Sequence, residues 1–274
     1  MKRLASFFYW FISKRYDISV KGEEILEGGG SRLYLPNHQA EIDPVVIMTI
    51  IGKHHVASPM ISATYYNLPF LKSFLKKLGA VSVSDLDQGV RDVSVMDTIR
   101  NGAIKAFAEG KSILLYPAGQ LSNQGYEKIF NKQSAYSLVQ DSTDELKIIA
   151  VRINGLWGSM WSRAWIGVSP PFLSTLLKSI FLFFINLIFF IPKRKVEVEF
   201  IDITKEAKEN SKSLSRREFN QYLEKLYNVK GEENARFIKH HFLQGKSKRT
   251  LPKRIKSIVS KNVNSIIYSK IPEE

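Results

Sequence analysis

The sequence predicts an α/β fold in which helices flank a largely parallel sheet. Short β-branched or apolar runs, typical of strands, alternate along the chain with segments of helical periodicity. Such alternation favours a parallel sheet. The chain has 274 residues, of which 44% are hydrophobic, enough for a sizeable core. The expected strands lie near residues 17–21, 32–35, 54–58, 79–84, 112–116, 147–153 and 195–201, with helices over 43–51, 67–77, 88–109 and 127–140 between them.

The N-terminal segment, residues 1–14, combines aromatic and basic residues. Aromatic side chains at 7–11 lie between the basic pairs at 2–3 and 14–15. The apolar stretch is too short to cross a bilayer and no small-x-small cleavage site follows it, so we expect no signal peptide. This pattern is typical of an amphipathic, membrane-associated segment lying among lipid head groups. An ordinary helix packed on its own domain is the alternative.

A second apolar segment, residues 172–191, carries one charge, Lys178. As a helix it would be about 30 Å long, the thickness of the hydrocarbon core. The strand expected at 195–201 belongs to the same sheet, however, and a full crossing would leave it on the wrong side of the membrane. We therefore expect a helix that lies on one leaflet or dips into it.

The last part of the chain, residues 205–274, is strongly basic. It holds 17 Lys and Arg against 8 Glu, and so supplies most of the net charge of +14. Apolar residues at helical spacing predict a basic helical tail after a main domain over 15–204. Such charge favours a polyanion, either nucleic acid or an anionic membrane. The absence of cysteine excludes disulfides, a cysteine nucleophile and thiolate metal sites.

The loop after the strand at 32–35 holds the best candidates for catalysis, His38 and Asp43. Asp43 and Pro44 precede an apolar run that ends at Gly52, a pattern typical of a helix N-cap, N1 proline and C′ glycine. His38 then lies at the carboxyl edge of a parallel sheet, where active sites of open α/β folds gather. A carboxylate facing the ring would fix its tautomer and stabilise the imidazolium.

Three sequence boxes give this pair a family context. NHQAEID (37–43) resembles the NHxxxxD box of the glycerolipid acyltransferase superfamily, the 1-acylglycerol-3-phosphate acyltransferases and their relatives. YPAGQLS (116–122) is an imperfect counterpart of the family's second box, and IAVRINGLWGS (149–159) is similar to a further one. The resemblance covers roughly residues 15–202, so the domain over 15–204 is expected to be an acyltransferase domain.

The resemblance implies transfer of an acyl group from acyl-CoA or acyl-carrier protein to a lysophospholipid hydroxyl, with neither metal nor redox cofactor. His38 would be the general base, oriented by Asp43, with no acyl-enzyme intermediate. The expected substrate-binding residues are Asn37, Tyr116, Pro117, Gly119, Ser122, Arg91 and Arg152. The expected partners are a phospholipid membrane and the two substrates, with no nucleic acid, at the cytoplasmic face of the inner membrane.

The chain departs from the family pattern at three positions. Ala118 and Leu121 stand where the second box carries Glu and Arg, and Asp85 stands where a middle box carries Arg. An arginine fork is a natural ligand of phosphate. Its loss favours a lysophospholipid with a larger head group over lysophosphatidic acid, unless Arg91, Arg152 or Arg163 replaces it.

Other interpretations stay open. The chain is alternatively a non-catalytic basic protein that binds membrane or nucleic acid on a decayed acyltransferase fold, or an acyltransferase with a non-glycerolipid acceptor. Residues 109–112 end like a P-loop but lack its first glycine and precede a strand. The pair at 54–55 lacks the downstream aspartate of another acyl-transfer family, and the pair at 240–241, expected at a solvated helix end, has no metal-ligand spacing.

Overall fold

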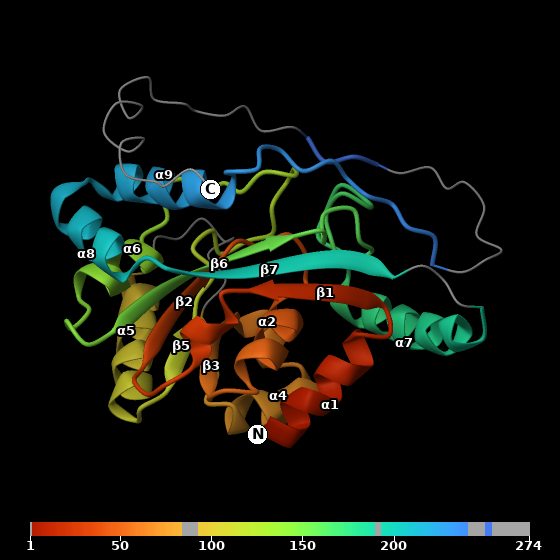
Figure 1. Cartoon of the computed structure of the whole chain (residues 1–274), viewed down its shortest axis with the longest axis horizontal. Coiled ribbons are helices and arrows are strands. Elements are labelled where there is room, and N and C mark those ends of the chain that lie inside the picture. Colours follow the sequence, from red (N-terminus) through yellow and green to blue (C-terminus); the bar gives the residue numbers. More distant parts are fainter. Residues whose placement is uncertain (1, 84–92, 190–192, 241–249, 254–274) are drawn as a thin grey trace.

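A seven-stranded sheet with strand order β1-β7-β6-β2-β5-β3-β4 forms the centre of the molecule (Figure 1). Neighbouring strands run parallel except β6 and β7, which are antiparallel. The computed structural model describes residues 2–83, 93–189, 193–240 and 250–253. The predicted α/β fold with a largely parallel sheet is confirmed. The strands are β1 (Tyr16–Lys21), β2 (Arg32–Pro36), β3 (Ala57–Ser62), β4 (Val81–Val83), β5 (Ser112–Leu114), β6 (Lys147–Asn154) and β7 (Arg194–Asp202).

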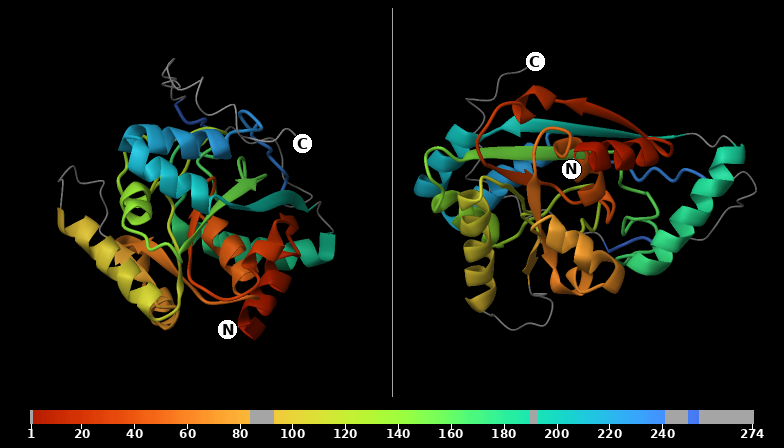
Figure 2. Two further views of the ribbon diagram at one scale, coloured as in Figure 1. Left: turned by 60° about the vertical axis from the view of Figure 1, so that its left-hand side comes forward. Right: turned by 90° about the horizontal axis from the view of Figure 1, so that it is seen from below.

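Helices cover both faces of the sheet (Figures 1 and 2). Successive residues of β2 show the division, because Leu33 and Leu35 join the core on one face and Tyr34 joins the core on the other. Helices α5, α6, α8 and α9 pack on the first face, and α1, α2 and the start of α7 pack on the second. The helices are α1 (Lys2–Ile12), α2 (Asp43–Ile51), α3 (Ala63–Tyr66), α4 (Pro69–Lys77), α5 (Val93–Ala108), α6 (Ser134–Gln140), α7 (Phe172–Phe189), α8 (Thr204–Ser213) and α9 (Arg216–Tyr227), with a 3₁₀ turn, η1 (Glu23–Leu26).

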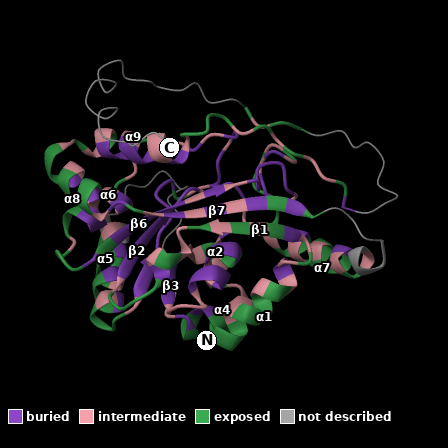
Figure 3. Ribbon diagram, viewed as in Figure 1, coloured by how far each residue is buried: buried purple, intermediate pink, exposed green. Residues whose placement is uncertain are grey.

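The two segments expected to be membrane-associated, α1 and α7, are helices that touch each other. The rings of Phe11 and Phe183 stack with their centroids 4.2 Å apart. Exposed parts of both helices are visible in Figure 3, and they include large apolar side chains. In the described part of the chain, no helix is long and apolar enough to span a membrane. The exposed apolar side chains are Leu4, Phe7, Phe8 and Trp10 on α1 and Leu173, Leu177, Ile180, Phe181 and Phe184 on α7.

The region expected to be a separate tail begins as part of the domain. Helix α9 buries Phe219, Leu223 and Tyr227 in the core that also holds Leu33 of β2. A boundary at residue 204 therefore divides one hydrophobic core, and we correct it: residues 205–227 belong to the domain. The apolar spacing seen in the sequence is the stripe that packs against the sheet. Most of the expected tail beyond residue 240 lies outside the described residues.

The helix expected over 127–140 forms only over its second half, α6. Before it, the backbone N–H groups of Ile129 and Phe130 donate to the Glu224 carboxylate of α9. The N–H of Glu127 donates to Asn228 Oδ1. These bonds satisfy the backbone without a helix, and Phe130 adopts a left-handed φ of 58°. Side chains that follow almost a hundred residues later thus override the local helical pattern.

Candidate active site

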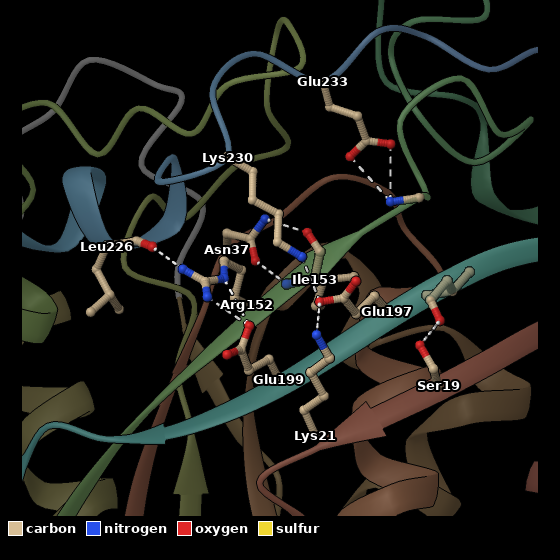
Figure 4. Close-up of polar contacts among 12 residues, drawn as sticks. Ser19, Lys21, Asn37, Arg152, Ile153, Glu197, Glu199, Leu226, Lys230 and Glu233 are labelled. Carbon is tan, nitrogen blue, oxygen red and sulfur yellow. Dashed lines mark hydrogen bonds and ion pairs between the residues drawn. The ribbon is translucent and has the colours of Figure 1, made fainter. Parts of the chain in front are cut away.

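His38 lies in the loop between β2 and α2, at the carboxyl edge of the sheet. β2 is hydrogen-bonded to β5 on one side and β6 on the other, so the loops after all three strands meet at this edge. The Asn37 side chain fixes the first loop. Its amide nitrogen donates to the carbonyl of Ile153 at 3.0 Å, and its oxygen accepts from the N–H of Ile153 at 2.7 Å (Figure 4). Asn37 therefore extends the β2–β6 pairing and places the next residue, His38, above the edge.

The His38 ring faces Asp43, with 3.1 Å between Nδ1 and Oδ2. Oδ2 also accepts from the backbone N–H groups of Gln39 at 2.6 Å and Ala40 at 3.0 Å. Asp43 is fully buried, whereas the His38 side chain keeps 16% exposure. With Nδ1 directed at the carboxylate, Nε2 is the nitrogen left to exchange a proton at the surface. This is the geometry of a general base with an orienting carboxylate.

Asp43 acts differently from the helix cap that the sequence predicted. It is the first residue of α2, and its carboxylate binds N–H groups that precede the helix. Burial raises the pKa of Asp43, opposed by the hydrogen bonds from His38 and the backbone. The expected C′ glycine is corrected as well, since Gly52 has an ordinary φ of −64°. A Cβ there would lie 2.8 Å from that of Ala5, so this glycine permits close packing of α1 on α2.

The loop after β5 supplies a ring beside His38. The Tyr116 and His38 rings lie with centroids 4.0 Å apart. Tyr116 is buried, which raises the pKa of its hydroxyl well above the ordinary value, and Asp43 and Glu127 add to the effect. Pro117 is buried next to it, while Gly119 is exposed at the tip of the turn with φ 62°. This conformation favours glycine.

Glu127 is a site residue that the sequence analysis missed. Its Oε2 accepts from Ser122 Oγ at 2.6 Å and from the His38 N–H at 3.1 Å. Burial raises the pKa of Glu127 to about 7, opposed by hydrogen bonds from Ser122 and His38. The segment containing Glu127 was expected to be helical, and a glutamate at a helix start gives no signal of an active site. Glu127 thus brings a buried carboxylate to Ser122 and His38, in a chain whose second box has Ala118 where the family carries a glutamate.

Of the two arginines expected to bind substrate, only Arg152 lies among the described residues, and it makes contacts within the fold. Arg152 donates to the Glu199 carboxylate at 2.6 and 3.1 Å and to the Leu226 carbonyl at 2.9 Å (Figure 4). These bonds join β6, β7 and α9, so we replace the expected substrate contact of Arg152 by a structural role. Arg91 and Asp85 lie outside the described residues.

Arg163 contacts the residue that follows the second box. Its Nη1 donates to Asn123 Oδ1 at 2.6 Å, and Asn123 follows Ser122 directly. Its Nε donates to Ser169 Oγ at 3.0 Å. The charges of Arg163 and His38 both act on Glu41, where burial raises the pKa and these two charges oppose it. Arg163 therefore places positive charge at the periphery of the His38–Asp43 loop.

Three further histidines in the described part of the chain have structural contacts, and His241 lies outside the described residues. His55 Nε2 lies 2.7 Å from Tyr34 Oη, and burial lowers the pKa of His55 to about 4. His54 faces Glu23 at 3.1 Å. His240, expected at a solvated helix end, is instead buried against Trp165. No group of three or more metal-ligating side chains occurs within the described ranges.

Comparisons with known proteins agree with this arrangement. The chain matches the acyltransferase family over residues 17–154, half of its length, and the match includes the His38–Asp43 loop and the second box. The fold and the sequence thus define an enzyme of the acyl-transferring class. The chain belongs to the acyltransferase family, which confirms the resemblance noted in its sequence boxes.

The structure is similar to the 1-acyl-sn-glycerophosphate (LPA) acyltransferase PlsC from Thermotoga maritima, with a TM-score of 0.51 and 18% sequence identity. The similarity covers 84% of this chain and 76% of that chain. At this identity it supports a common fold. No curated protein matches the chain by sequence.

Proposed function

We propose that the protein transfers a fatty acyl group from an acyl thioester to the hydroxyl of a lysophospholipid. The observation that carries the proposal is the pair formed by His38 and Asp43, whose buried carboxylate faces Nδ1 and leaves Nε2 for the substrate. In the proposed step, Nε2 takes the acceptor's hydroxyl proton while the oxygen attacks the thioester carbonyl carbon. The C–S bond breaks, and the imidazolium returns the proton to the leaving thiolate. The products are the acylated lipid and a free thiol.

Asp43 supports this step in two ways. It accepts a hydrogen bond from Nδ1–H, which keeps the lone pair of the neutral ring on Nε2. It also stabilises the imidazolium that forms in the transition state. The N–H groups of Gln39 and Ala40 hold the carboxylate in place. Proton transfer of this kind contributes about 10² to 10⁴ in rate.

The donor is a thioester of coenzyme A or acyl-carrier protein. Both carry negative charge, and the net charge of +14 suits either of them. His38 returns the proton that it takes, so the two substrates supply every atom of the two products. The reaction therefore needs neither a metal ion nor a redox cofactor, and no nucleic acid takes part.

The acceptor is a lysophospholipid with a diester head group. Ala118 and Leu121, both buried, are apolar residues where the family's second box carries a carboxylate and a guanidinium, so neither can donate to a phosphate. A phosphate monoester carries more negative charge than a diester and needs more donors in a partly desolvated cleft. The structurally similar PlsC from Thermotoga maritima is an LPA acyltransferase, so lysophosphatidic acid is the natural comparison acceptor.

The enzyme works at a phospholipid surface, on the cytoplasmic face of the inner membrane. Support comes from the exposed apolar side chains of α1 and α7, which lie on helices in contact through Phe11 and Phe183. Apolar side chains flanked by Lys and Arg favour insertion among anionic head groups. Both helices pack on the same face of the sheet, so one attachment surface can hold the acceptor's bilayer near the site.

The test is an assay of purified protein with either donor, a panel of lysolipids in mixed micelles, and His38→Ala as control. Acylated lipid from the wild type, reduced about 10² to 10⁴-fold in the folded variant, is the expected result. Equal product from both proteins contradicts the mechanism. Binding to vesicles or nucleic acid without acyl transfer from any donor favours a non-catalytic basic protein instead. Transfer to an acceptor other than a glycerolipid would support the proposed chemistry and contradict the proposed lysophospholipid acceptor.

A further inference from the structure

The chain after α9 crosses the loops of the active site. We call residues 228–240 the strap. Its backbone bonds to two of these loops, since the N–H of Glu233 donates to the carbonyl of Gly125 at 2.7 Å and the N–H of Arg236 donates to that of Trp157 at 3.2 Å. The guanidinium of Arg15 donates to the carbonyl of Lys239 at 3.2 Å, which ties the far end to the beginning of the domain. The strap lies beyond the region that matches the family, residues 17–154.

Two glycines allow the backbone of the strap to pass close to the active-site loops. A Cβ on Gly125 would come within 1.8 Å of the Glu233 carbonyl oxygen. A Cβ on Gly158, which also has φ 90°, would come within 2.6 Å of the backbone N and O of Arg236. Backbone therefore passes against backbone at both crossings, and any larger residue would displace the strap.

Glu233 is the strap residue that reaches the catalytic loop. Its carboxylate accepts from Gln39 Nε2 at 2.7 Å. The same carboxylate accepts from the N–H of Gly155 at 3.0 and 3.1 Å (Figure 4). Gln39 is also held from its other side, because its Oε1 accepts from the N–H of Leu156 at 3.0 Å. The side chain of Gln39 is thus fixed between the strap and the loop that follows β6.

We propose that Glu233 is a positioning residue of the active site, acting through Gln39 and Asp43 on His38. The path is continuous: Glu233 holds the Gln39 side chain, the Gln39 N–H donates to Asp43 Oδ2 at 2.6 Å, and the same oxygen faces His38 Nδ1. The role in catalysis rests on the acyl transfer proposed above. The hydrogen-bonded path from Glu233 to His38 does not depend on that function and can be tested separately.

The carboxylate is needed because both of its partners are donors. A carboxylate accepts at both oxygens, whereas a glutamine offers one accepting oxygen and one donating nitrogen. In Glu233→Gln the new NH₂ group would face either the Gly155 N–H or the Gln39 NH₂ group. At least one of the three hydrogen bonds is then lost, and a donor faces a donor. If Gln39 flips to accept from the new amide, the Leu156 N–H loses its acceptor in turn.

The experiment is a double-mutant cycle on the full chain with Glu233→Gln, Gln39→Ala and the combined variant, and with Glu209→Gln on α8 as control. We expect Glu233→Gln to lower kcat by about 10 to 100-fold with little change in KM, as a misplaced catalytic group does. The combined variant should be about as slow as Gln39→Ala alone, because residues acting along one path are not additive. The control should keep wild-type kcat and all four proteins the wild-type Tm within a few degrees.

A second readout does not depend on activity. NMR of ¹⁵N-labelled histidine, with the His38 signal assigned from His38→Ala, reports the tautomer and titration of the ring. We expect Glu233→Gln to shift this signal, and Glu209→Gln to leave it unchanged. A shifted signal in a protein that transfers no acyl group supports the positioning role and contradicts the proposed function. Unchanged kcat and signal in Glu233→Gln, or effects of Glu233→Gln and Gln39→Ala that multiply, overturn the inference.

Discussion

The backbone N–H of Ser122 donates to the carbonyl oxygen of His38 at 2.7 Å. On the other side of the same residue, the His38 N–H donates to Glu127, which also accepts from the Ser122 hydroxyl. Both backbone polar groups of His38 are therefore held by the loop after β5. The ring is held independently by Asp43. This double attachment limits the freedom of His38 before any substrate binds, which is the preorganisation a general base requires.

The first prediction concerns the negative charge of Asp43. Its Oδ2 accepts from the Gln39 and Ala40 N–H groups and faces His38 Nδ1. In Asp43→Asn, an amide oxygen in the position of Oδ2 can keep these contacts, so the loop should persist. The amide carries no charge to stabilise the imidazolium, so proton transfer to His38 becomes less favourable and kcat should fall about 10² to 10⁴-fold.

The measurement for Asp43→Asn is acyl transfer at saturating donor, with circular dichroism to confirm folding. Asp17→Asn on β1, where the side chain is exposed, is the matched control and should keep full activity. A folded Asp43→Asn protein with wild-type kcat would show that the charge of Asp43 is not needed for catalysis.

The second prediction concerns the effect of pH on stability through Glu127. Burial raises its pKa from 4.5 to about 7. Between these values the folded protein keeps a proton that the unfolded chain releases, so this group's contribution to the free energy of unfolding falls as pH rises. The loss across the window is on the order of 3 kcal/mol. Glu127→Gln cannot titrate and should lack this loss.

Chemical denaturation of wild type and Glu127→Gln at several pH values checks this. The free energy of unfolding of the wild type, minus that of the variant, should decrease from pH 4.5 to pH 7 and then level off. Other groups contribute equally to both proteins and cancel. A difference that does not vary with pH would mean that Glu127 is ionised throughout the window.

The third prediction concerns the acceptor. With one acyl donor, kcat/KM should be higher for a lysophospholipid with a diester head group than for lysophosphatidic acid of the same chain length. The reason is that Ala118 and Leu121 supply no charge or donor for a phosphate monoester at these two positions of the second box. The alternative outcome is a preference for lysophosphatidic acid. Arg163 is the residue to test for it, because its guanidinium donates to Asn123 beside Ser122. A wild-type preference for lysophosphatidic acid that disappears in Arg163→Ala would show that Arg163 replaces the missing fork.

The fourth prediction concerns attachment to lipid. Ile12 at the end of α1 is buried, so deleting the helix would disturb the core, and substitutions at exposed positions are the better probe. We expect Phe7→Ser with Trp10→Ser on α1, or Leu177→Ser with Phe181→Ser on α7, to lower vesicle binding at least tenfold. The estimate follows from about 1.5 to 3 kcal/mol for each fully buried large apolar side chain.

Flotation with anionic vesicles at high salt measures this, since salt suppresses the contribution of the basic residues. Ile104→Ser on α5 is the matched control, because its side chain is 57% exposed on a helix of the opposite face. If the control weakens binding as much as the paired variants, or high salt releases the wild type completely, attachment by α1 and α7 is wrong.

Local patterns in the sequence were sufficient for the seven strands and for the contact between the candidate pair, His38 and Asp43. Alternation of apolar runs predicted all seven strands to within a few residues. The spacing of His38 and Asp43 placed one near a strand end and the other at a helix start, and a separation of five residues allows contact. Both inferences need only neighbours in the chain. The start of α6 failed because Glu224 of α9 binds the backbone that was expected to be helical.

What the sequence by itself determined is the α/β fold, the acyltransferase class and the identity of the candidate base and its carboxylate. The tertiary structure alone decided the surroundings of that pair. Glu127 is 89 residues from His38 and Glu233 is 194 residues from Gln39, and neither stands in a motif. The tertiary structure also shows that Arg152 forms an ion pair with Glu199 within the sheet. Periodicity and spacing report on neighbours along the chain, whereas the charge and hydrogen bonds around a buried group come from whichever distant segments pack against it.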